Sequence, residues 1–520
     1  MTRVNMKLSR TIRLFAIVAY AGVSFAQAPG GAGPSSSGGS STATILPASG
    51  RTNQTGSVAA IEQPVPGPTT RVNTLNPNVT ISGPYSGSIR STTAIPFSGM
   101  LSLGEAVRRG LAYNLGSVGL AQTARLNSAQ VRAARSALLP NINSSLSENV
   151  QQTDLAAFGL HFSVPGFHVA TIAGPYNYYA LQATLSQTVA NLTVVDNYRS
   201  AKATARASQS SLEDARDLVT LAVGGAYLQV LAAQARLDSA QAQLDTANAV
   251  FHQSSEQHQE GVLGRLNVDQ SQLQTLAQQQ QIITLRSDLA KQKINLARLV
   301  GIAPNAEYQL TDRFDFSPAP VQSVNDAVAR AEQQRADLKA AQSQVEAAQK
   351  ALAAARAERL PSASLSGYYE AIGTTPSQSH GAFSVVGTLS VPIWQGGRIE
   401  ADIAQAKAVL AQREAELEDT RGQIEAEVRE TYLDLEAAVG QVEVARKNLQ
   451  VAQEALQMAR ARMEAGVINT VEVVQAQQTV SSAQLDLINS VFAHNLAKLS
   501  LARDLGHASE QLPALLKPAH

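Results

Sequence analysis

Residues 428–463 read "VRETYLDLEAAVGQVEVARKNLQVAQEALQMARARM" and carry the pattern that decides the fold. A large apolar residue recurs at every seventh position, and a small residue follows each of the first five, three positions later. The large positions are Val428, Leu435, Val442, Leu449, Leu456 and Met463, and the small ones are Thr431, Ala438, Ala445, Ala452 and Ala459. This repeat is typical of a coiled-coil seam, and alanine at the second seam position lets two helix axes approach closely.

The same pattern occurs earlier in the chain, and both occurrences lie in very long helical stretches. Its large positions are Val223, Val230, Leu237, Leu244 and Phe251, and its small ones are Ala226, Ala233, Ala240 and Ala247. No proline interrupts residues 193–260 or 393–465. At 1.5 Å per residue each helix is roughly 100 Å long, so it must lie in a bundle or a tube.

The chain contains two copies of one unit, which we assign to residues 99–301 and 322–506 with a Pro-rich linker at 302–321. Tyr227 and Gly261 match Tyr432 and Gly466 at one spacing, and Pro140 matches Pro361 at a longer one. Each unit reads helix, strand, loop, strand, long helix, break, helix. The short helices are expected at about 103–139, 265–300, 323–360 and 471–505.

The expected strands cover about 141–150, 178–189, 362–372 and 382–393, and residues of two kinds alternate along them. In the third strand, Ala363, Leu365, Gly367 and Tyr369 share one face, and the other face holds Ser362, Ser364, Ser366 and Tyr368. One apolar and one polar face suit a tilted strand between lipid and a water-filled lumen. A soluble β-sandwich with one buried face is the alternative. Aromatic residues expected at the membrane interface are Tyr176, Tyr178, Tyr179, Tyr368, Tyr369 and Trp394.

The N-terminal residues 1–26 read as a secretory signal peptide, with basic residues before a short apolar stretch that ends at Ala26. A membrane anchor is the alternative, but the stretch is short. Residues 27–98 are rich in Ser, Gly, Thr and Pro, which predicts a flexible leader without a core of its own. Residues 507–520 form a C-terminal tail. No later stretch reaches the ~18 consecutive apolar residues of a membrane helix, so a mature chain that spans a membrane must use strands.

Composition excludes several classes of function. The 41 basic residues balance the 41 acidic ones, which argues against a nucleic-acid binder that neutralises phosphates. The chain has no cysteine, so it has no disulfide, thiolate nucleophile or cysteine metal site. We recognise no catalytic constellation, metal cluster or cofactor motif, and we expect a protein that is not an enzyme.

Four strands cannot close a barrel, and an open sheet edge in lipid leaves backbone groups unpaired at a cost of several kcal/mol each. Long helices with apolar positions on two sides need neighbours in the same way. The chain is therefore expected to associate and to enclose a continuous tube, part β and part α.

Several motifs resemble the repeated signatures of the TolC-like outer membrane efflux protein family. They are "LSLGEAVRRGLAYN" (101–114), "AARSALLPNINSSLS" (133–147), "LSVPIWQGGRIEADI" (389–403) and "AGVINTVEVVQAQ" (465–477). The resemblance covers about residues 99–506, although the first copy reads "TVANLTVV" (188–195) in place of "PIWQGGR".

This resemblance implies a mainly α fold with a β-barrel part: a homotrimer with a 12-stranded outer-membrane barrel continuous with a long periplasmic α-helical barrel. It implies a passive exit duct of a tripartite efflux or secretion system, located in the cell outer membrane with a large periplasmic portion. The implied partners are a periplasmic adaptor protein, an inner-membrane pump and outer-membrane lipids. The alternative is a structural or adhesive coiled-coil trimer of the cell surface, which explains the heptads but not the alternating strands.

The resemblance also implies roles for the two breaks after the long helices. Glycine commonly ends a helix in the left-handed conformation, and Gly261 and Gly466 follow the long helices. The implied adaptor-docking residues are Gly261, Val262, Leu263, Gly466, Val467 and Ile468. An alternative is that each apolar pair closes its own turn.

Glu472 and Gln475 occupy positions where the family places acidic rings at the closed periplasmic end of the tunnel. Three Glu472 carboxylates in a trimer would attract cations and resist closure unless they are protonated or paired. Because Gln475 is neutral, one charged ring is expected. Asn469 with Glu472 also fits a helix-capping arrangement, which would by itself explain the acidic residue.

Overall fold

The computed structural model of the 520-residue chain describes residues 57–65, 74–89, 97–154, 157, 171–318, 323–465, 467, 470–506 and 508–509. The predicted signal peptide lies outside the described residues, as do Gly466, Ile468 and Asn469.

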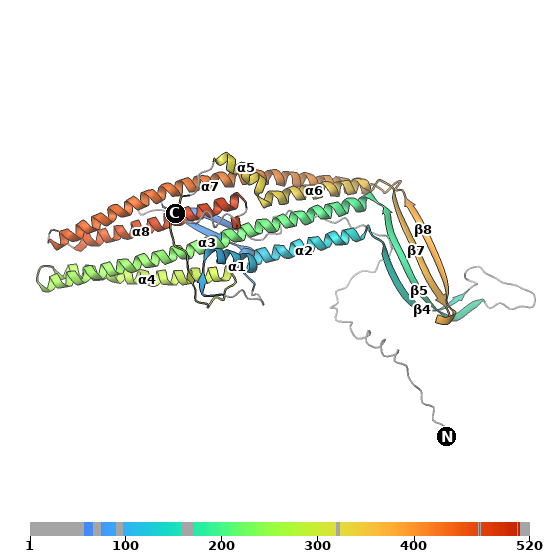
Figure 1. Cartoon of the computed structure of the whole chain (residues 1–520), viewed down its shortest axis with the longest axis horizontal. Helices are drawn as coiled ribbons and strands as arrows, with labels where there is room; N and C mark the ends of the chain where they lie inside the picture. The colour runs from blue at the N-terminus through green and yellow to red at the C-terminus, as the bar shows by residue number, and fades with distance from the viewer. Residues whose placement is uncertain are drawn as a thin grey trace, which may run out of the picture. The chain divides into compact units, whose positions relative to one another are not determined.

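Long helices and a four-stranded sheet account for most of the described residues (Figure 1). The helices are α1 (Leu103–Tyr113), α2 (Leu115–Ser136), α3 (Leu192–Gln259), α4 (Arg265–Leu299), α5 (Val324–Gln334), α6 (Ala336–Ala357), α7 (Arg398–Glu464) and α8 (Thr470–Asp504). Two 3-10 turns are η1 (Gly83–Ser86) and η3 (Pro376–Gln378). Helices α2 and α4 pack along α3, and α6 and α8 pack along α7, while α6 and α8 also contact α3. The mainly helical fold with antiparallel strands and two repeats is therefore confirmed.

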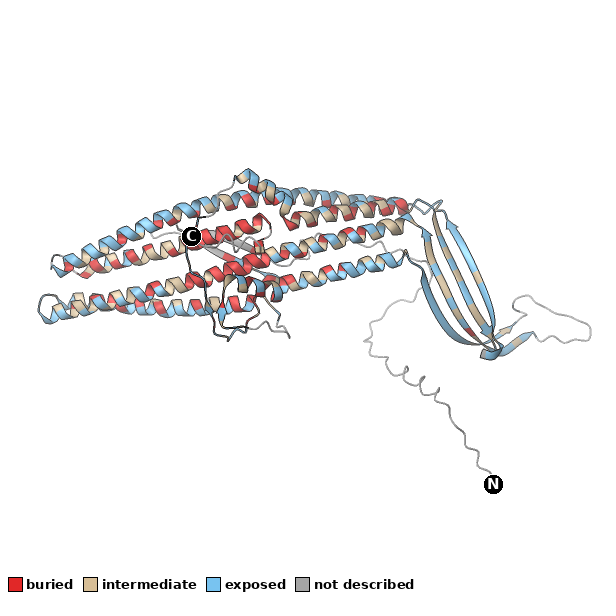
Figure 2. Ribbon diagram, viewed as in Figure 1, coloured by how far each residue is buried: buried red, intermediate tan, exposed pale blue. Residues whose placement is uncertain are grey.

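The heptad pattern predicted the packing of α7 correctly. The buried residues in the half of α7 that leads to its C-terminal end are seam positions: Val428, Thr431, Ala438, Val442, Ala445, Ala452 and Met463. Leu449 and Leu456 pack with Val480 and Ala483 of α8. Figure 2 shows this narrow buried stripe on an otherwise exposed helix.

The main core surrounds the centre of α3. This helix contains an 18-residue window with a mean hydropathy of 1.5, and 83% of that window is buried within the protein. The apolar character of α3 thus reflects its contacts with neighbouring elements. Gly224 and Gly225 allow two of these neighbours to approach the helix backbone closely. A Cβ atom at Gly224 would lie 2.7 Å from Leu499 of α8, and one at Gly225 would lie 2.5 Å from Val79.

Part of the segment predicted as a flexible leader is structured, so the expectation that residues 27–98 lack a core is wrong for this part. Strands β1 (Val58–Val65) and β2 (Thr74–Ile81) pair antiparallel and contact α3 and α8. Tyr85 is buried against Gly116, and the Asn114 side chain donates a hydrogen bond to the Tyr85 carbonyl oxygen at 2.7 Å. Because these stabilising contacts come from distant helices, local composition did not reveal them.

Two of the expected short helices are each divided in two. Asn114 (φ −62°, ψ 134°) separates α1 from α2, and Arg335 (φ −61°, ψ 130°) separates α5 from α6. The Asn114 side chain caps α2 by accepting a hydrogen bond from the Gly116 amide at 2.9 Å. Both breaks lie at the same place in the two repeats.

The four-stranded sheet has the order β4-β5-β7-β8, and every neighbouring pair is antiparallel. Its strands are β4 (Asn141–Asp154), β5 (Ile172–Ala190), β7 (Ser362–Gly373) and β8 (His380–Ser390). Strands β4 and β5 are longer than expected, while β8 ends before Val391. A small parallel pair, β3 (Met100–Leu101) with β6 (Gln309–Leu310), lies beside α1 and joins the start of the first repeat to the linker.

Candidate functional site: sheet faces and hairpin tips

The sheet register gathers most apolar residues on one face and most small polar residues on the other, although Ser144, Glu148 and Asn177 lie on the apolar face and Ile372 and Val386 on the polar face. Residues directly opposite each other in an antiparallel pair share a face, so the register links Ile142 to Leu185, Gly367 and Val385. The apolar face comprises Ile142, Leu146, Val150, Leu181, Leu185, Leu365, Tyr369, Phe383, Val385 and Leu389. The polar face comprises Asn143, Ser145, Ser147, Asn149, Gln182, Thr184, Ser186, Ser364, Ser366, Ser384 and Thr388.

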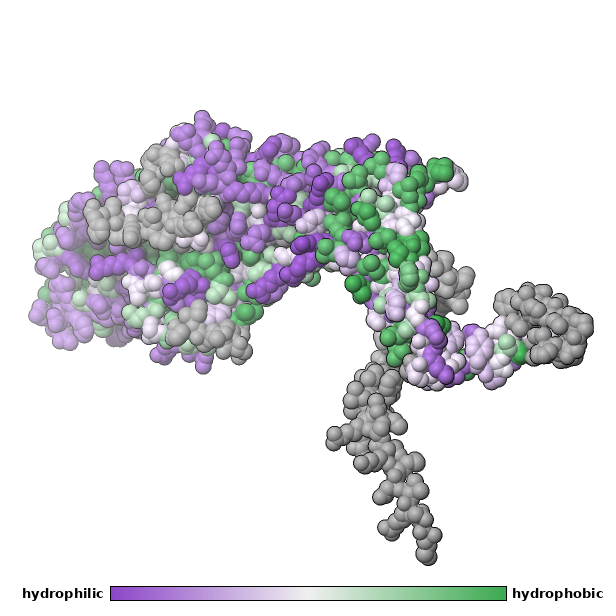
Figure 3. All heavy atoms as spheres, turned by 45° about the vertical axis from the view of Figure 1, so that its right-hand side comes forward, coloured by the Kyte–Doolittle hydropathy of each residue, from purple (hydrophilic) through white to green (hydrophobic). Residues whose placement is uncertain are grey.

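The apolar face is exposed in the single chain. Phe383 is 78% exposed, Ile142 is 73% exposed and Leu389 is 70% exposed. Figure 3 shows hydrophobic residues gathered over the strands and over the helix ends that adjoin them. A soluble sandwich would cover such a face, and no described residue packs a second layer upon it.

The aromatic residues expected at the membrane interface divide between the two faces of the sheet, and their place at the interface stays a prediction. Tyr179 and Tyr369 lie on the apolar face, opposite Glu148 and Phe383. Tyr178 pairs with Asn149 and Tyr368 pairs with Thr184, so both lie on the polar face. Tyr176 stacks on Tyr178 and therefore also belongs to the polar face. Trp394, which is 85% exposed, follows β8 at the end of the sheet next to the helices.

Both outer strands of the sheet have a free edge. Strand β4 pairs only with β5 and β8 pairs only with β7 among the described strands. These edges are 14 and 11 residues long, and a long apolar edge strand is a site for pairing with another chain.

Helices α4 and α7 also present apolar side chains that no described residue covers. Leu266, Leu273 and Ile283 of α4 are 65–68% exposed. Leu433, Val444, Val451 and Met458 of α7 are 56–70% exposed. Each helix uses its other side to pack on its neighbour in the chain, so these residues form second, unpartnered surfaces.

The first hairpin tip joins α3 to α4. Gly261 has a positive φ of 78° and open space around the position of a Cβ atom. The amides of Val262 and Leu263 both donate to the Gln257 carbonyl oxygen, at 2.8 and 3.2 Å, which closes the turn. Val262 is 65% exposed, whereas Leu263 packs with Val250, Met463 and Val473. The predicted apolar pair therefore divides: one residue faces outward and the other holds the two tips together.

The second tip joins α7 to α8, and only part of it is described. Val467 is 66% exposed, and its amide donates to the Arg462 carbonyl oxygen at 2.9 Å. Gly466 and Ile468 lie outside the described residues, as does Asn469, so the capping arrangement stays a prediction.

Glu472 and Gln475 both lie in the first turns of α8 and are exposed. The Glu472 carboxylate lies 3.9 Å from the Arg462 guanidinium of α7, with both side chains more than half exposed. Sequence reasoning did not identify Arg462, because the pair bridges the two arms of the hairpin. At this exposure the pair contributes at most about 1 kcal/mol, but it places a positive charge beside the candidate gate.

A buried ionic cluster, also missed from the sequence, connects helices of the second repeat. Arg335 contacts Asp337 and Glu427 at 2.7 Å each, and its side chain is 3% exposed. Arg503 of α8 contacts Glu427 at 2.6 Å and Asp504 at 3.1 Å. We name these five residues the α5–α8 ionic cluster; it fixes the break between α5 and α6 against α7 and α8.

The charges of this cluster shift the pKa of two carboxyl groups. Burial by itself would raise the pKa of Asp337, but the hydrogen bond and charge of Arg335 and the charge of Arg503 outweigh it, and the pKa is lowered. Burial opposes the same two arginines at Glu427, and there too the pKa is lowered. Both carboxyl groups are therefore ionised at neutral pH.

A second buried pair lies on α8 beneath the linker. His494 and Lys498 are fully buried, and Lys498 donates to the backbone oxygen and the hydroxyl of Ser317 at 3.0 and 2.9 Å. The Phe316 ring lies 4.5 Å from the His494 ring. Burial, together with the charge of Lys498, lowers the pKa of His494 to about 4. Burial lowers the pKa of Lys498 to about 8.

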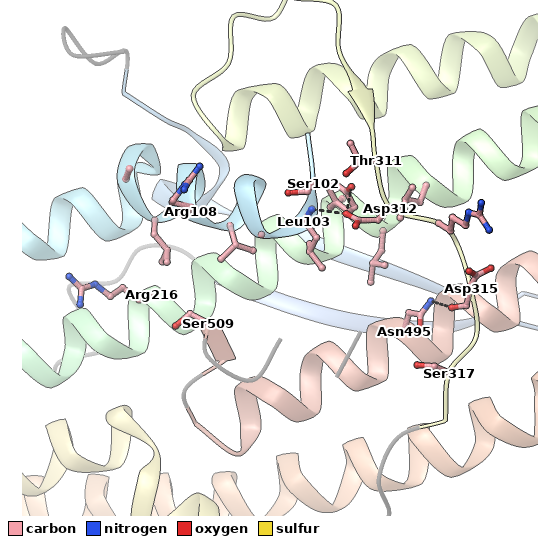
Figure 4. Close-up of a pocket in the computed structure, with 18 residues that line it drawn as sticks. Ser102, Leu103, Arg108, Arg216, Thr311, Asp312, Asp315, Ser317, Asn495 and Ser509 are labelled. Carbon is pink, nitrogen blue, oxygen red and sulfur yellow. Dashed lines mark hydrogen bonds between the residues drawn. The ribbon is translucent and has the colours of Figure 1, made fainter. Parts of the chain in front are cut away.

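A cavity of about 1050 Å³ lies between α1, α3, α8 and the linker (Figure 4). The Asp312 carboxylate accepts hydrogen bonds from the Leu103 amide at 2.7 Å and the Tyr227 hydroxyl at 2.6 Å. Asn495 donates to the Asp315 carbonyl oxygen at 3.2 Å. These bonds tie the linker to both repeats, and we assign the cavity no ligand.

Comparisons with known proteins agree with the two-repeat architecture. The family model described as "Outer membrane efflux protein" matches residues 120–302 and 327–507. Outer membrane protein TolC of Vibrio cholerae is 22% identical over 396 residues, which cover 73% of this chain and 85% of that protein.

Two solved structures have the same fold. VceC of Vibrio cholerae superposes with a TM-score of 0.65 at 19% identity, covering 78% of this chain and 96% of that one. The CmeC outer membrane channel of Campylobacter jejuni gives a TM-score of 0.67 at 17% identity, covering 88% of this chain and 98% of that one.

Proposed function

The chain belongs to the outer membrane efflux protein family, and from this premise we propose that three copies assemble into one passive exit duct. As a family member it is an outer membrane efflux channel with a periplasmic helical part, and it is not an enzyme. Three sheets of four strands supply the twelve strands of the proposed barrel. The long helices form the proposed periplasmic tunnel.

The observation that carries this proposal is the four-stranded sheet with one apolar face, one polar face and two free edges. In lipid each unpaired backbone group costs several kcal/mol, so a spanning sheet must close. Closure of the sheet pairs the backbone groups of both edges. With the apolar face toward lipid and the polar face inward, it also keeps polar side chains out of the lipid. One chain has too few strands to close, and further copies of the same chain provide matching edges.

The unpartnered surfaces of α4 and α7 support the same assembly. They lie on different helices of one chain, so α7 of one copy can pack against α4 of the next around a ring. A ring of such head-to-tail contacts leaves no apolar surface uncovered, as cyclic symmetry requires.

We further propose that the duct receives its substrates from an inner-membrane pump through a periplasmic adaptor that docks on the hairpin tips. The exposure of Val262 and Val467 supports them as contacts. Gly261, Gly466 and Ile468 are included because the family resemblance implies the whole of each tip. Leu263 is proposed to stabilise the tip from within, because it packs against the second hairpin.

Glu472 is proposed to form the charged ring at the periplasmic end, with Gln475 as a neutral ring three residues further along α8. Exposure of both side chains supports this role, and Arg462 would moderate the charge of the ring. Cations should therefore be favoured over anions, but less strongly than an unpaired ring of carboxylates would favour them.

Cysteine cross-linking tests the assembly, because the natural chain contains no cysteine. Ser145→Cys in β4 combined with Thr388→Cys in β8 should give covalent trimers with a short bifunctional maleimide in outer membranes. Ser364→Cys in the central strand β7, combined with Ser145→Cys, is the matched control and should give fewer. A watertight monomer without cross-links would refute the duct. Cross-linked trimers that never conduct in planar bilayers would favour a structural or adhesive surface protein instead.

A further inference from the structure

We propose that the polar face of the sheet holds a wall site for planar aromatic cations with two levels, Tyr176 and Tyr178 at one and Tyr368 with Glu370 at the other. This inference rests on the proposed function, because the polar face lines a lumen only if the sheet closes into a barrel.

The register fixes the positions of the three tyrosines. Tyr178 pairs with Asn149 and Tyr176 pairs with Gln151, near the end of β5 that is distant from the helices. Tyr368 pairs with Thr184, six residues along β5 from Tyr178. At about 3.3 Å per residue the two groups lie ~20 Å apart along the strand. A molecule leaving the tunnel would meet Tyr368 first and the Tyr176–Tyr178 pair second.

The geometry of the Tyr176–Tyr178 pair prepares it for a flat ligand. The ring centroids are 6.5 Å apart and the ring planes differ by 27°. The Gln151 side chain is hydrogen-bonded to the Tyr176 hydroxyl, which restrains one of the rings. Tyr176 and Tyr368 are each 40% exposed in the single chain, so ring surface is available to a ligand. Aromatic faces carry negative electrostatic potential and attract both flat rings and cations.

The charge of this face selects the sign of the ligand. Glu370 pairs with Gln182 and Ala382 on the polar face, two residues along β7 from Tyr368. Across the described strand positions of this face, Glu370 is the acidic residue, and neither lysine nor arginine occurs. Serine, threonine, asparagine and glutamine dominate the remaining positions and attract no particular ion. The Glu370 carboxylate lies two residues from the Tyr368 ring, and opposite a position four residues along β5 from Tyr178, about 13 Å away. It therefore favours an aromatic cation over an aromatic anion most strongly at the Tyr368 level.

The site should bind weakly enough to release its ligand. The rings are partly exposed and lie on the wall of a wide lumen, so a ligand would contact one chain at a time rather than plug the duct. In a trimer, three equivalent wall sites, each with two levels, would raise the local concentration of aromatic cations near the exit without stopping their movement.

The test uses the assembled trimer in planar bilayers, with ethidium as the planar aromatic cation and tetraethylammonium as a cation without rings. The double variant Tyr176→Ser/Tyr178→Ser should need about ten times more ethidium to halve the current than the natural trimer needs. Tyr176→Phe/Tyr178→Phe should keep it within about twofold, because the ring faces remain. Tyr179→Ser is the matched control, because Tyr179 lies on the same strand but on the apolar face. This variant should leave the ethidium concentration that halves the current unchanged.

Two results would overturn the wall site. One is an unchanged ethidium block in the double serine variant, and the other is equal block of the natural trimer by tetraethylammonium. Should the double variant fail to assemble, Tyr368→Ser in β7 gives the same test with an expected threefold weaker block. A trimer that conducts normally but shows either result refutes the wall site alone, whereas a trimer that never conducts refutes the duct.

Discussion

The α5–α8 ionic cluster gives the sharpest test of how the helical part is held together, through Arg335→Met. This change removes a guanidinium that lies 2.7 Å from both Asp337 and Glu427. The Arg335 and Asp337 side chains are only 3% and 9% exposed, so solvent cannot replace the lost charge. Leaving a buried carboxylate without its partner typically costs about 3–5 kcal/mol. We therefore expect Arg335→Met to lower the free energy of unfolding by about 3–5 kcal/mol at neutral pH.

The control is Arg421→Met on α7. Arg421 lies 2.7 Å from Glu418, but both side chains are at least 45% exposed. An exposed pair of this kind contributes at most about 1 kcal/mol. The two ion pairs have the same separation but different burial, so Arg335→Met should lose more stability than Arg421→Met. The measurement is the urea midpoint of the circular dichroism signal of each variant in the same detergent.

The dependence on pH separates charge from packing. In the natural chain the folded pKa values of Asp337 and Glu427 are lowered, so their contribution is present above the unfolded values of about 4 and is lost at lower pH. In Arg335→Met, Asp337 loses the guanidinium that donates to it, so burial raises its pKa relative to the natural chain, whereas Glu427 keeps Arg503 at 2.6 Å. Protonation of Asp337 at low pH therefore relieves the cost of one buried carboxylate that has lost its hydrogen-bonded partner. The loss relative to the natural chain should therefore be smaller at pH 4.5 than at pH 7.5. An equal loss at both values would refute the electrostatic explanation and leave only lost packing.

Three further changes test other parts of the molecule. Glu472→Ala should raise conductance and weaken the preference for cations; unchanged ion selectivity in bilayer recordings would remove Glu472 from the gate. His494→Leu should flatten the fall in stability between pH 6.5 and pH 4, since the unfolded chain binds a proton that the buried ring, with a pKa of about 4, does not. His494 should contribute a loss of ~1.4 kcal/mol per pH unit in this range, and parallel stability curves of variant and natural chain would contradict the assignment. Val262→Asp and Val467→Asp should weaken co-purification with the adaptor and leave the urea unfolding midpoint unchanged, whereas Leu263→Asp should lower that midpoint. Equal behaviour of the three variants would contradict the separate roles of the exposed valines and the packed leucine.

The long helices and the two faces of the sheet could be predicted from sequence because their patterns are local and repeated. An apolar residue recurs every seventh position of α7 from Val428 to Met463, and each of these seam positions is buried or half-buried. The sequence also predicts that Tyr178 and Tyr179 lie on different faces of the sheet, because adjacent strand residues point to opposite sides.

Features that depend on distant contacts could not be predicted in this way. The strand that contains Val79 packs on Gly225, far along the chain, and its own sequence resembles a linker. Arg335 meets Glu427 across 92 positions, and no local pattern connects them. The helix break at Arg335 contains neither glycine nor proline, so the usual signals of a break are missing there.

The two unbroken helices also restrict how such a duct can change its length during evolution. Helices α3 and α7 contain 68 and 67 residues, and each has shorter companions packed beside it. Inserting one residue would rotate everything beyond it by about 100° and move the seam away from its neighbour. Seven residues added to both long helices and to one companion of each would lengthen the tube by ~10 Å and nearly restore the seam. Ducts of this construction should therefore differ in reach by whole heptads, gained or lost in both repeats together.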